Sequence, residues 1–522
     1  MTSRTKISRQ ALFAFIALWI AGCAGTPPDP TPPKRAADSA AQADIYAVGY
    51  RSISEKYIDP ISVAEIAVGG MQGFAAIDPA LRVERAGDLV RLTMDGRGIS
   101  EFKAPGDDDS NAWAGLTVSF EQAGRDHSAL MKKASAEKRY EAVFDGMLAN
   151  LDVFSRYAGA DEARRNRARR DGFGGIGIRF KIKNDKPIIT MVMPGTPAAN
   201  VELKAGDEIT HIDGEALLKP KVHDVVAKLR GPTHSEVKVR VYRARADRSI
   251  DVIMERLHIV PPTVKASLEN GLVVLKISSF NQATARSVAK ELEAAKEQAG
   301  DGLRGLIIDL RGNPGGLLKQ SVKVADLLLT HGHIVSTRGR HPDSLHHYEA
   351  GGRDLAGGLP TVVLVDGKSA SASEIVAAAM QDRGRAVLIG TSSFGKGTVQ
   401  TVIRLPNDGE VTLTWSRLVA PSGYALHGLG VRPAICTSGG THDLKAFLRR
   451  SVAERLKARS SFSSWRTVGI GEKEARRELR ESCPSERRDT ELELKLARML
   501  LDNQPLYAQA IELSATTNQA HK

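Results

Sequence analysis

Two windows of the sequence carry residue types that could cleave an amide bond. Residues 367–375 place Ser371 between an apolar run and a predicted helix, and residues 394–400 contain Lys396 and Gln400. A serine hydroxyl is a weak nucleophile until a base takes its proton, and a lysine can act as that base only when its pKa falls toward neutrality. Burial lowers the pKa of a lysine because it disfavours the ammonium form. The chemistry open to these windows is therefore attack by a serine, provided that the fold buries the lysine.

The residues that follow Lys396 alternate as in a half-buried strand. A mostly apolar face is formed by Val399, Thr401, Ile403 and Leu405. Successive side chains of a strand point to opposite sides, so Lys396, Thr398 and Gln400 are predicted to share the other face. Taken alone, Lys396 would be a surface lysine and Gln400 a solvent-facing strand residue.

Ser371 also fits a purely structural role. Ser371 and Glu374 match the S-x-x-E capping box, in which two side chains satisfy unpaired backbone N–H groups at a helix start. An isolated match would favour helix capping. The distant pair Lys396 and Gln400, in the right context, favours catalysis instead.

With these windows, the sequence closely resembles the carboxyl-terminal processing, or tail-specific, serine proteases. The resemblance covers roughly residues 44–437 and is strongest over residues 303–405. It implies Ser371 as nucleophile, Lys396 as general base and Gln400 as the residue that orients the lysine. The separations of 25 and four residues match the family pattern. The resemblance also implies a crotonase-like α/β protease core.

An oxyanion hole is predicted where Ser371 passes from a strand into a helix. Unpaired backbone N–H groups and the helix dipole at such a start stabilise negative charge. The N–H group of Ala372 is one predicted donor. The turn that contains Gly315 and Gly316 is predicted to supply the other, because its missing side chains permit close approach.

Four phrases between residues 174 and 214 occur in the order found in PDZ domains of the bacterial protease type. They are Gly174–Ile178, Pro194–Ala199, Leu203–Ile209 and Ile212–Gly214. We predict a PDZ-like, β-rich domain over residues 171–256, with a helix at Val222–Leu229 and a closing strand at Val237–Tyr242. The loop that would bind a substrate carboxylate through its N–H groups consists of Gly174, Gly175, Ile176 and Gly177. A tight turn without a ligand is the alternative for this loop.

Residues 261–437 alternate predicted strands and helices, which indicates an α/β protease core with helices covering a sheet. The predicted strands are Leu272–Ile277, Leu303–Leu310 and Thr361–Val365, and the predicted helices are Ala283–Gln298, Leu317–Leu329 and Glu374–Gln381. The sequence therefore predicts a multi-domain α/β fold.

The flanks of this core, residues 44–170 and 438–522, are predicted to be mostly helical. The first carries a β insertion near residues 86–125, and its predicted strands are Leu89–Phe102 and Trp113–Phe120. Apolar positions on one face predict a helix around residues 444–452 and a second one near Leu492–Leu501.

The amino terminus has the length and charge order of an export signal. Basic residues precede the apolar run Ala11–Ile20, which is too short to span a bilayer as a stable helix. Ile20–Cys23 is similar to the bacterial lipobox, which implies a signal peptide at residues 1–22 and a lipidated Cys23. An ordinary cleaved signal is the alternative. Residues 23–43 are rich in proline and alanine and predict a flexible tether.

The resemblance to lipoproteins has a further implication for location. Ala24 follows the cysteine where an inner-membrane retention signal would place aspartate, so an outer-membrane anchor facing the periplasm is expected. Cys436 and Cys483 are the cysteines that remain, and export would expose them to an oxidising compartment. A disulfide between them and two free thiols both stay open.

Composition and motifs exclude other classes. The chain of 522 residues, with 42% hydrophobic content, can build several cores, and the arginine-rich run at residues 162–170 favours a solvated helical face over nucleic-acid binding. Neither a G-x-S-x-G elbow nor an H-E-x-x-H pair occurs, so no histidine triad, metal or cofactor is predicted.

The sequence thus predicts a serine endopeptidase that cuts envelope proteins near their carboxyl ends. The expected partners are unfolded or carboxyl-terminally exposed proteins, with the membrane reached by a lipid anchor. A homo-oligomer and an activating adaptor both stay open. The alternative function is an inactive PDZ-containing lipoprotein scaffold, but a scaffold would be expected to have lost Ser371 or Lys396.

Overall fold

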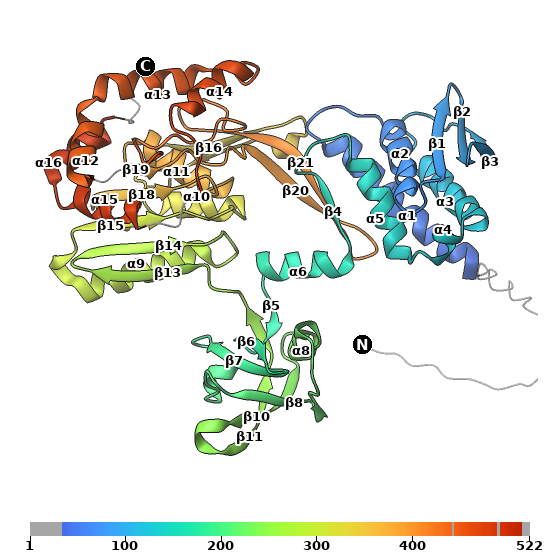
Figure 1. Cartoon of the computed structure of the whole chain (residues 1–522), viewed down its shortest axis with the longest axis horizontal. Helices are drawn as coiled ribbons and strands as arrows, with labels where there is room; N and C mark the ends of the chain where they lie inside the picture. The colour runs from blue at the N-terminus through green and yellow to red at the C-terminus, as the bar shows by residue number, and fades with distance from the viewer. Residues whose placement is uncertain (1–33, 441–442, 488–490, 514–522) are drawn as a thin grey trace, which may run out of the picture.

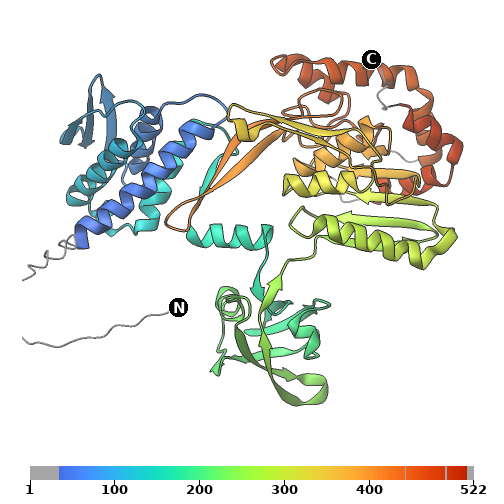
Figure 2. The ribbon, with the colours of Figure 1, turned by 180° about the vertical axis from the view of Figure 1, so that it is seen from behind.

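The computed structural model describes residues 34–440, 443–487 and 491–513. Figures 1 and 2 show the amino-terminal helices at one end and an α/β core with the carboxyl-terminal helices at the other. A separate β-rich unit, residues 173–259, is suspended between them on a pair of strands. The chain is therefore multi-domain and mixes helix and sheet, as predicted.

The α/β core is built on a sheet whose strand order is β13-β14-β15-β18-β19-β22. Its strands are β13 Val264–Glu269, β14 Leu272–Ile277, β15 Gly305–Asp309, β18 Thr361–Val365, β19 Val387–Gly390 and β22 Ile435–Cys436. From β14 onward the strands are parallel. Alternate residues of β15 enter different cores, with Leu306 and Ile308 on one face and Ile307 on the other. This double burial explains the continuous apolar runs of these strands.

Helices cover both faces of the core sheet. One face carries α9 Thr284–Ala299, α10 Leu318–Asp326 and α11 Ala372–Asp382; the other carries α12 Leu444–Ala453, α15 Leu492–Leu501 and α16 Gln504–Ile511. Two more carboxyl-terminal helices are α13 Arg455–Thr467 and α14 Lys473–Glu481. The predicted strands β14 and β18 and the predicted helix α15 have the same bounds in the structure, which confirms these predictions.

A second sheet joins this core to the amino-terminal region. Its order is β17-β16-β21-β20, and its strands are β16 His333–Arg338, β17 His346–Glu349, β20 Thr398–Arg404 and β21 Glu410–Val419. The β20–β21 hairpin extends from the core to the amino-terminal helices, where β4 Arg156–Ala158 pairs with β21 (Figure 1). Its base packs into the α/β core through Leu418, whereas Ile403 and Leu413 near its tip belong to the amino-terminal core.

The amino-terminal region combines helices with a small antiparallel sheet. Its helices are α1 Lys34–Lys56, α2 Val63–Gln72, α3 Ser110–His127, α4 Ala129–Lys133 and α5 Ala136–Leu148, and its sheet consists of β1 Leu81–Ala86, β2 Leu89–Met94 and β3 Arg97–Lys103. The predicted strand Trp113–Phe120 is wrong, because it lies within α3. Trp113, Leu116 and Phe120 are buried at spacings of three and four residues, which is the period of a helix.

The tether predicted over residues 23–43 is also wrong in its second half. Helix α1 begins at Lys34, directly after Pro33. The stretch from residue 34 to 43 is rich in alanine and free of proline, and alanine is the strongest helix former. Burial of Tyr46, Tyr50 and Ile53 farther along then stabilises the helix.

The β-rich unit has the predicted helix and closing strand. Its sheet runs β11-β10-β8-β7-β6, with β6 Ile178–Lys183, β7 Lys186–Val192, β8 Glu208–Ile212, β10 Glu236–Arg243 and β11 Arg248–Glu255, and α8 spans Val222–Leu229. The chain enters through β5 Phe173–Gly175 and leaves through β12 Leu257–Ile259, which pair with each other. The unit is thus joined to the rest of the chain at one place.

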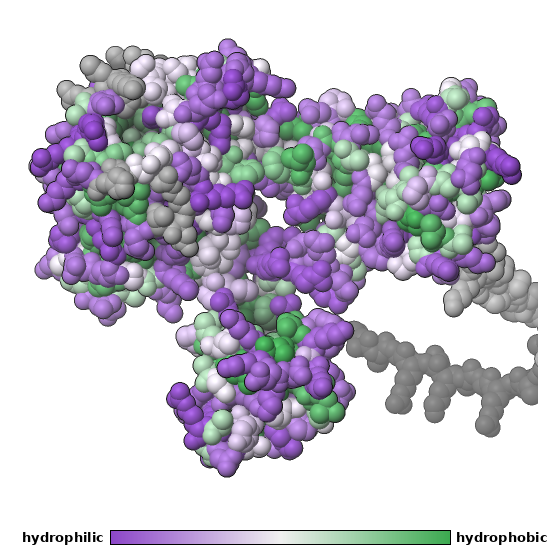
Figure 3. All heavy atoms as spheres, in the orientation of Figure 1, coloured by the Kyte–Doolittle hydropathy of each residue, from purple (hydrophilic) through white to green (hydrophobic). Residues whose placement is uncertain are grey.

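The arginine-rich run forms α6, Ala160–Arg170, just before this junction. Ala163 and Ala168 point inward, and Figure 3 shows a hydrophilic surface over the helix. Arg167 and Arg170 form ion pairs with Glu410 at 2.9 and 3.2 Å. The run is therefore a solvated helical face with structural ion pairs, as predicted. Across the described ranges, we find no helix that combines the length and hydropathy needed to span a bilayer.

Candidate active site

Two turns meet at the carboxyl ends of the adjacent parallel strands β15 and β18. They are residues 311–316 and residues 366–371. The N–H group of Ala370 and the hydroxyl of Ser373 both donate to the carbonyl oxygen of Asn313, each at 3.0 Å. The carboxyl edge of a parallel sheet is the usual place for a binding site in such folds. The sheet therefore brings the predicted serine and the predicted glycine turn together.

Ser371 stands at the junction between this turn and α11. Its backbone has φ 55° and ψ −110°, a conformation that is uncommon for a residue other than glycine. Strained residues of this kind cluster at functional sites. The Ser371 side chain makes no capping hydrogen bond, whereas its N–H group donates to Glu374 Oε2 at 2.6 Å. The glutamate half of the predicted capping box is therefore formed.

The glycine turn lies against Ser371. A Cβ atom on Gly315 would lie 3.0 Å from the Cβ atom of Ser371, and one on Gly316 would lie 2.1 Å from the Phe280 carbonyl oxygen. No side chain fits at either position. The N–H group of Gly315 donates to Asn313 Oδ1 at 2.9 Å, so the predicted role of Gly315 as a donor is not supported. Within the described ranges, the N–H group of Gly316 makes no hydrogen bond.

The carboxylate of Glu374 connects the segment that contains Ser371 with the segment that contains Lys396. Its Oε2 accepts from Ser371 N–H at 2.6 Å and from Lys396 N–H at 3.0 Å. Its Oε1 accepts from the Ser393 hydroxyl at 2.5 Å and from Gly395 N–H at 2.7 Å. Glu374 is fully buried, and this burial raises its pKa while the four hydrogen bonds oppose the rise. The sequence indicated Glu374 only as a capping residue.

Lys396 lies in a half-buried position, in the loop before β20. Burial lowers the pKa of Lys396, and the charge of Arg156 lowers it further, whereas Asp152 and Glu374 oppose the shift. Its Nζ atom lies 4.9 Å from the centre of the Phe154 ring. Among the residues that the structure describes, no hydrogen bond joins Lys396 Nζ to the Ser371 hydroxyl. The lysine thus has the environment of a base, and its ammonium group faces an aromatic ring.

Phe154 belongs to a turn that is fastened to β21. Asp152 Oδ1 accepts from Phe154 N–H at 2.7 Å, from Ser155 N–H at 3.1 Å and from the Thr414 hydroxyl at 3.0 Å. These bonds hold the backbone of the turn that carries Phe154 against β21. No sequence signal marked Phe154, because it comes from the amino-terminal region and a single phenylalanine carries no pattern.

Gln400 lies on β20 but does not contact the lysine through a hydrogen bond. Its Nε2 donates to Thr398 Oγ1 at 2.9 Å and to Thr414 Oγ1 at 3.3 Å. Thr398 and Gln400 therefore share a face, as predicted. The predicted face did not hold for Lys396, because β20 begins only at Thr398. A bulge at Val399 and Gln400 further interrupts the alternation.

The predicted carboxylate-binding loop lines a small cavity in the β-rich unit. The cavity, about 70 Å³, lies between Gly175–Phe180 on one side and Val226–Arg230 on the other. The carbonyl groups of Ile176 and Gly177 accept from Ala198 and Met193, whereas their N–H groups donate to no described residue. Gly174 packs against the backbone of Gly231. The loop therefore presents free N–H groups beside the groove between β6 and α8.

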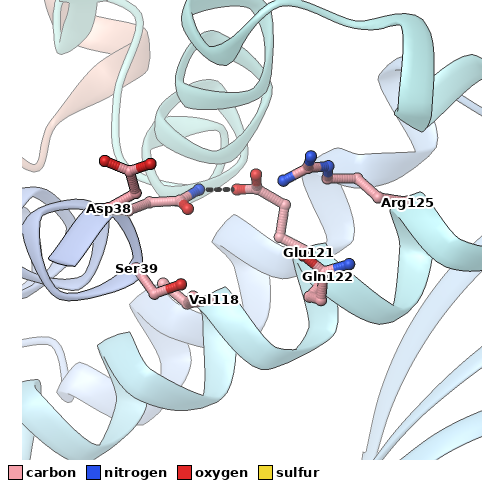
Figure 4. Close-up of a pocket in the computed structure, with 7 residues that line it drawn as sticks. Asp38, Ser39, Val118, Glu121, Gln122 and Arg125 are labelled. Carbon is pink, nitrogen blue, oxygen red and sulfur yellow. Dashed lines mark hydrogen bonds between the residues drawn. The ribbon is translucent and has the colours of Figure 1, made fainter. Parts of the chain in front are cut away.

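A larger cavity of about 460 Å³ lies between α1 and α3, away from these residues (Figure 4). Glu121 lies at its centre, and its carboxylate accepts from Gln42 Nε2 at 2.5 Å and from the Tyr46 hydroxyl at 2.8 Å. Arg139 Nε pairs with the same carboxylate at 2.5 Å. Because the buried charge is compensated internally, we assign this cavity a structural role.

The cysteine predictions have different outcomes. Cys436 and Cys483 form a disulfide, which is one of the two alternatives left open. Cys23 and the signal at residues 1–22 lie outside the described residues. In the described part of the chain, no group of three or more His, Cys, Asp or Glu side chains could hold a metal ion.

Comparisons with known proteins agree with this architecture. Residues 271–437 match peptidase family S41, and residues 188–243 match the PDZ domain family. The carboxy-terminal-processing protease of Bartonella bacilliformis is 38% identical over 301 residues, which cover 57% of this chain and 69% of that protein. A probable CtpA-like serine protease of Staphylococcus aureus is 29% identical over 59% of this chain and 62% of its own.

Among solved structures, a photosystem II D1 C-terminal processing protease aligns over 75% of this chain and 92% of its own, with 23% identity and a TM-score of 0.38. The Bartonella relative exceeds 30% identity over more than two thirds of its length. The two family models together cover a peptidase region and a PDZ region of this chain. The chain therefore belongs to the carboxy-terminal-processing proteases, a family of PDZ-containing serine-type peptidases.

Proposed function

We propose that this chain is an endopeptidase in which Ser371 is the nucleophile and Lys396 the general base. The observation that carries the proposal is the shared carboxylate of Glu374, which binds the backbone N–H groups of both residues. Two segments 25 residues apart are thereby held at one buried point. A surface lysine and a helix-capping serine would have no reason to share such a point.

The chemistry follows from these positions. Neutral Lys396 Nζ takes the proton of the Ser371 hydroxyl as its Oγ attacks the substrate carbonyl carbon. The N–H groups of Ala372 and Gly316 stabilise the oxyanion. The lysine ammonium then gives its proton to the leaving amine, and water hydrolyses the acyl-enzyme with Lys396 again as base. Before attack the lysine side chain turns from the ring of Phe154 toward Ser371, and Gln400 orients it there.

We further propose that the PDZ domain captures the carboxyl end of unfolded envelope proteins. The free N–H groups of Ile176 and Gly177 support this role, because backbone N–H groups in such a loop bind a terminal carboxylate. The peptide would add as a strand beside β6, with its last side chain in the small cavity against α8. Cleavage would then occur near the captured end.

The test compares one unstructured peptide with a free and an amidated carboxyl end. The wild type should cut the free peptide about ten to a hundred times more efficiently, because amidation removes a charge-assisted contact. Ser371→Ala should cut neither. A variant that lacks residues 171–256 should lose the preference. Equal rates for both peptides in the wild type would refute capture, and tail binding without any cleavage by the wild type would favour the scaffold function.

The proposed location is the periplasmic face of the outer membrane, reached by a lipid on Cys23. The lipobox-like sequence Ile20–Cys23 supports the anchor, and Ala24 supports the outer membrane. The disulfide between Cys436 and Cys483 is consistent with export, because disulfides persist in oxidising compartments.

A further inference from the structure

A groove of about 450 Å³ adjoins the proposed catalytic residues. It lies between α10 and the sheet that contains β16, β17, β20 and β21. Gln400 of β20 lines it, and so does Leu317, the residue next to Gly316. The groove therefore lies beside β20, the strand that follows Lys396, and beside the glycine turn. The sequence predicted no substrate-binding residue in this groove. Gln400 was predicted only to orient Lys396.

One wall of the groove is an unpaired strand edge. Strand β20 ends its sheet, and within the described ranges no strand pairs with its outer edge. Residues 399–402 of this strand line the groove, and the side chain of Val402 is 39% exposed. An unpaired edge offers N–H and C=O groups that an extended peptide can bind as an additional strand.

The lining also contains polar groups without partners. Ser416 is fully buried, and its hydroxyl makes no hydrogen bond to a described residue. The Nε1–H group of Trp415 has no partner in the described ranges either. Both donor atoms are closed to solvent, so a ligand in the groove would contact the edge of β20 and the charged side chains and not these donors.

The charge of the groove is positive. Lys319 and Lys323 stand one turn apart on α10, both line the groove, and both are exposed. Neither lysine forms an ion pair with a described residue. Lys276 and Arg311, in contrast, each form an ion pair with Asp309. Asp343 is the acidic residue in the lining, and it lies beside His341. A carboxylate side chain would therefore complement the two lysines.

We propose that this groove is a subsite for an extended acidic segment of the substrate. The segment pairs with the outer edge of β20, and an aspartate or glutamate side chain in it binds Lys319 and Lys323. This proposal rests on the proposed function for its substrate, but binding at the groove does not require the chemistry of Ser371. The two can therefore be tested separately.

The experiment measures binding of labelled peptides by fluorescence anisotropy to the full chain carrying Ser371→Ala. The peptides are amidated, so that the PDZ domain contributes little, and they differ only in one internal Glu or Gln. The Glu peptide should bind about three to ten times more tightly at low salt, with a smaller difference at high salt. Blocking alternate backbone N–H groups of the peptide by methylation should weaken binding.

Variants of the two lysines show where the selection occurs. The pair Lys319→Ala and Lys323→Ala should bind both peptides equally, and Lys319→Glu with Lys323→Glu should prefer a Lys peptide. Lys265→Ala with Lys290→Ala is the matched control, because it removes the same charge from exposed positions outside the groove. Unchanged thermal unfolding should accompany each variant, since the side chains are exposed.

The outcomes are distinct. Equal binding of the Glu and Gln peptides with both lysines intact would overturn the subsite, as would a preference that survives their removal. If the preference follows the lysines but the protein with Ser371 intact cuts no peptide, the subsite stands and the proposed function fails.

Discussion

Ser371 and Lys396 donate their backbone N–H groups to the same atom, Glu374 Oε2, at 2.6 and 3.0 Å. The other oxygen of this buried carboxylate binds Ser393 and Gly395, which belong to the loop that carries the lysine. The backbones of the proposed nucleophile and base are thus fixed to one another, and within the described ranges no hydrogen bond joins their side chains.

Glu374→Gln should lower kcat strongly and change KM little. Glutamine offers one oxygen in place of two and directs an NH₂ group at N–H donors, so the two loops lose their common acceptor. We expect kcat to fall about ten- to a hundred-fold and the free energy of unfolding to fall by about 1–3 kcal/mol. Steady-state kinetics and urea unfolding measure both. Glu293→Gln, at an exposed position of α9, is the control. A parallel rise of KM would contradict a positioning role.

Lys396→Ala should abolish cleavage about as completely as Ser371→Ala. A nucleophile and its base act as a unit, so removing either one removes most of the catalysis. Gln400→Ala should have a milder effect, because Gln400 bonds to Thr398 and Thr414 and not to the lysine. Peptide cleavage rates provide the measurement. Normal turnover by Lys396→Ala would end the dyad proposal.

The pH dependence of kcat/KM should report the state of Lys396. Only the neutral amine accepts a proton, so activity should rise as pH rises through the pKa of Lys396. Burial lowers that pKa, and the rise should therefore come at a lower pH than an exposed lysine would give.

Phe154→Leu should move this rise to lower pH still. The face of an aromatic ring stabilises a cation by about 0.5–2 kcal/mol, and Lys396 Nζ lies 4.9 Å from the ring centre. Loss of the ring removes this stabilisation of the ammonium form and so lowers the pKa of the lysine further. The pH profiles of kcat/KM for wild type, Phe154→Leu and the distant control Phe102→Leu test this. A shift to higher pH, or the same shift in the control, would disprove it.

Reduction of the disulfide should destabilise the carboxyl-terminal helices. Cys436 and Cys483 are 47 residues apart, and closing a loop of this length stabilises a protein by about 4 kcal/mol in the chain-entropy estimate. The double variant Cys436→Ser and Cys483→Ser should unfold at lower urea concentration. Its unfolding should not respond to reducing agent, whereas that of the wild type should. A wild type that is insensitive to reductant would show that the bond contributes no stability.

The anchor can be tested by labelling. The wild type should incorporate labelled fatty acid and sediment with outer membranes, and Cys23→Ser should do neither. Fatty-acid labelling that never occurs in the wild type would reject the lipoprotein proposal, and sedimentation with inner membranes would reject the role given to Ala24.

The sequence predicted those parts of the fold whose pattern is local. Strand β18 was predictable because four consecutive apolar residues follow Thr361, and all five residues are buried in a parallel sheet that is covered on both faces. Helix α8 was predictable because the order of the PDZ phrases located it. The strand predicted at Trp113–Phe120 failed because buried positions at a spacing of three and four were taken for alternation.

The site was predictable in its residue types but not in its connections. Ser371 and Lys396 stood out because each lies in a short local motif. Glu374 accepts hydrogen bonds from both Ser371 and Lys396, and the second bond comes from a loop about 20 residues farther along the chain. Phe154 reaches the lysine only because β4 pairs with β21, a contact between residues about 250 positions apart. Lys396 was predicted on a strand face but lies in a loop, because β20 begins only at Thr398. A bulge at Val399 and Gln400 further interrupts the alternation of side chains.

The β20–β21 hairpin makes the minimal catalytic unit larger than the peptidase-family segment. One end of the hairpin is packed in the core of the α/β sheet, and Ile403, Val411 and Leu413 at the other end are packed among the amino-terminal helices. A chain trimmed to residues 261–437 would leave these side chains in water and release the strand that follows Lys396. The amino-terminal helices therefore hold the far end of the hairpin whose first strand follows Lys396, and the position of this lysine depends on a region outside the peptidase-family segment.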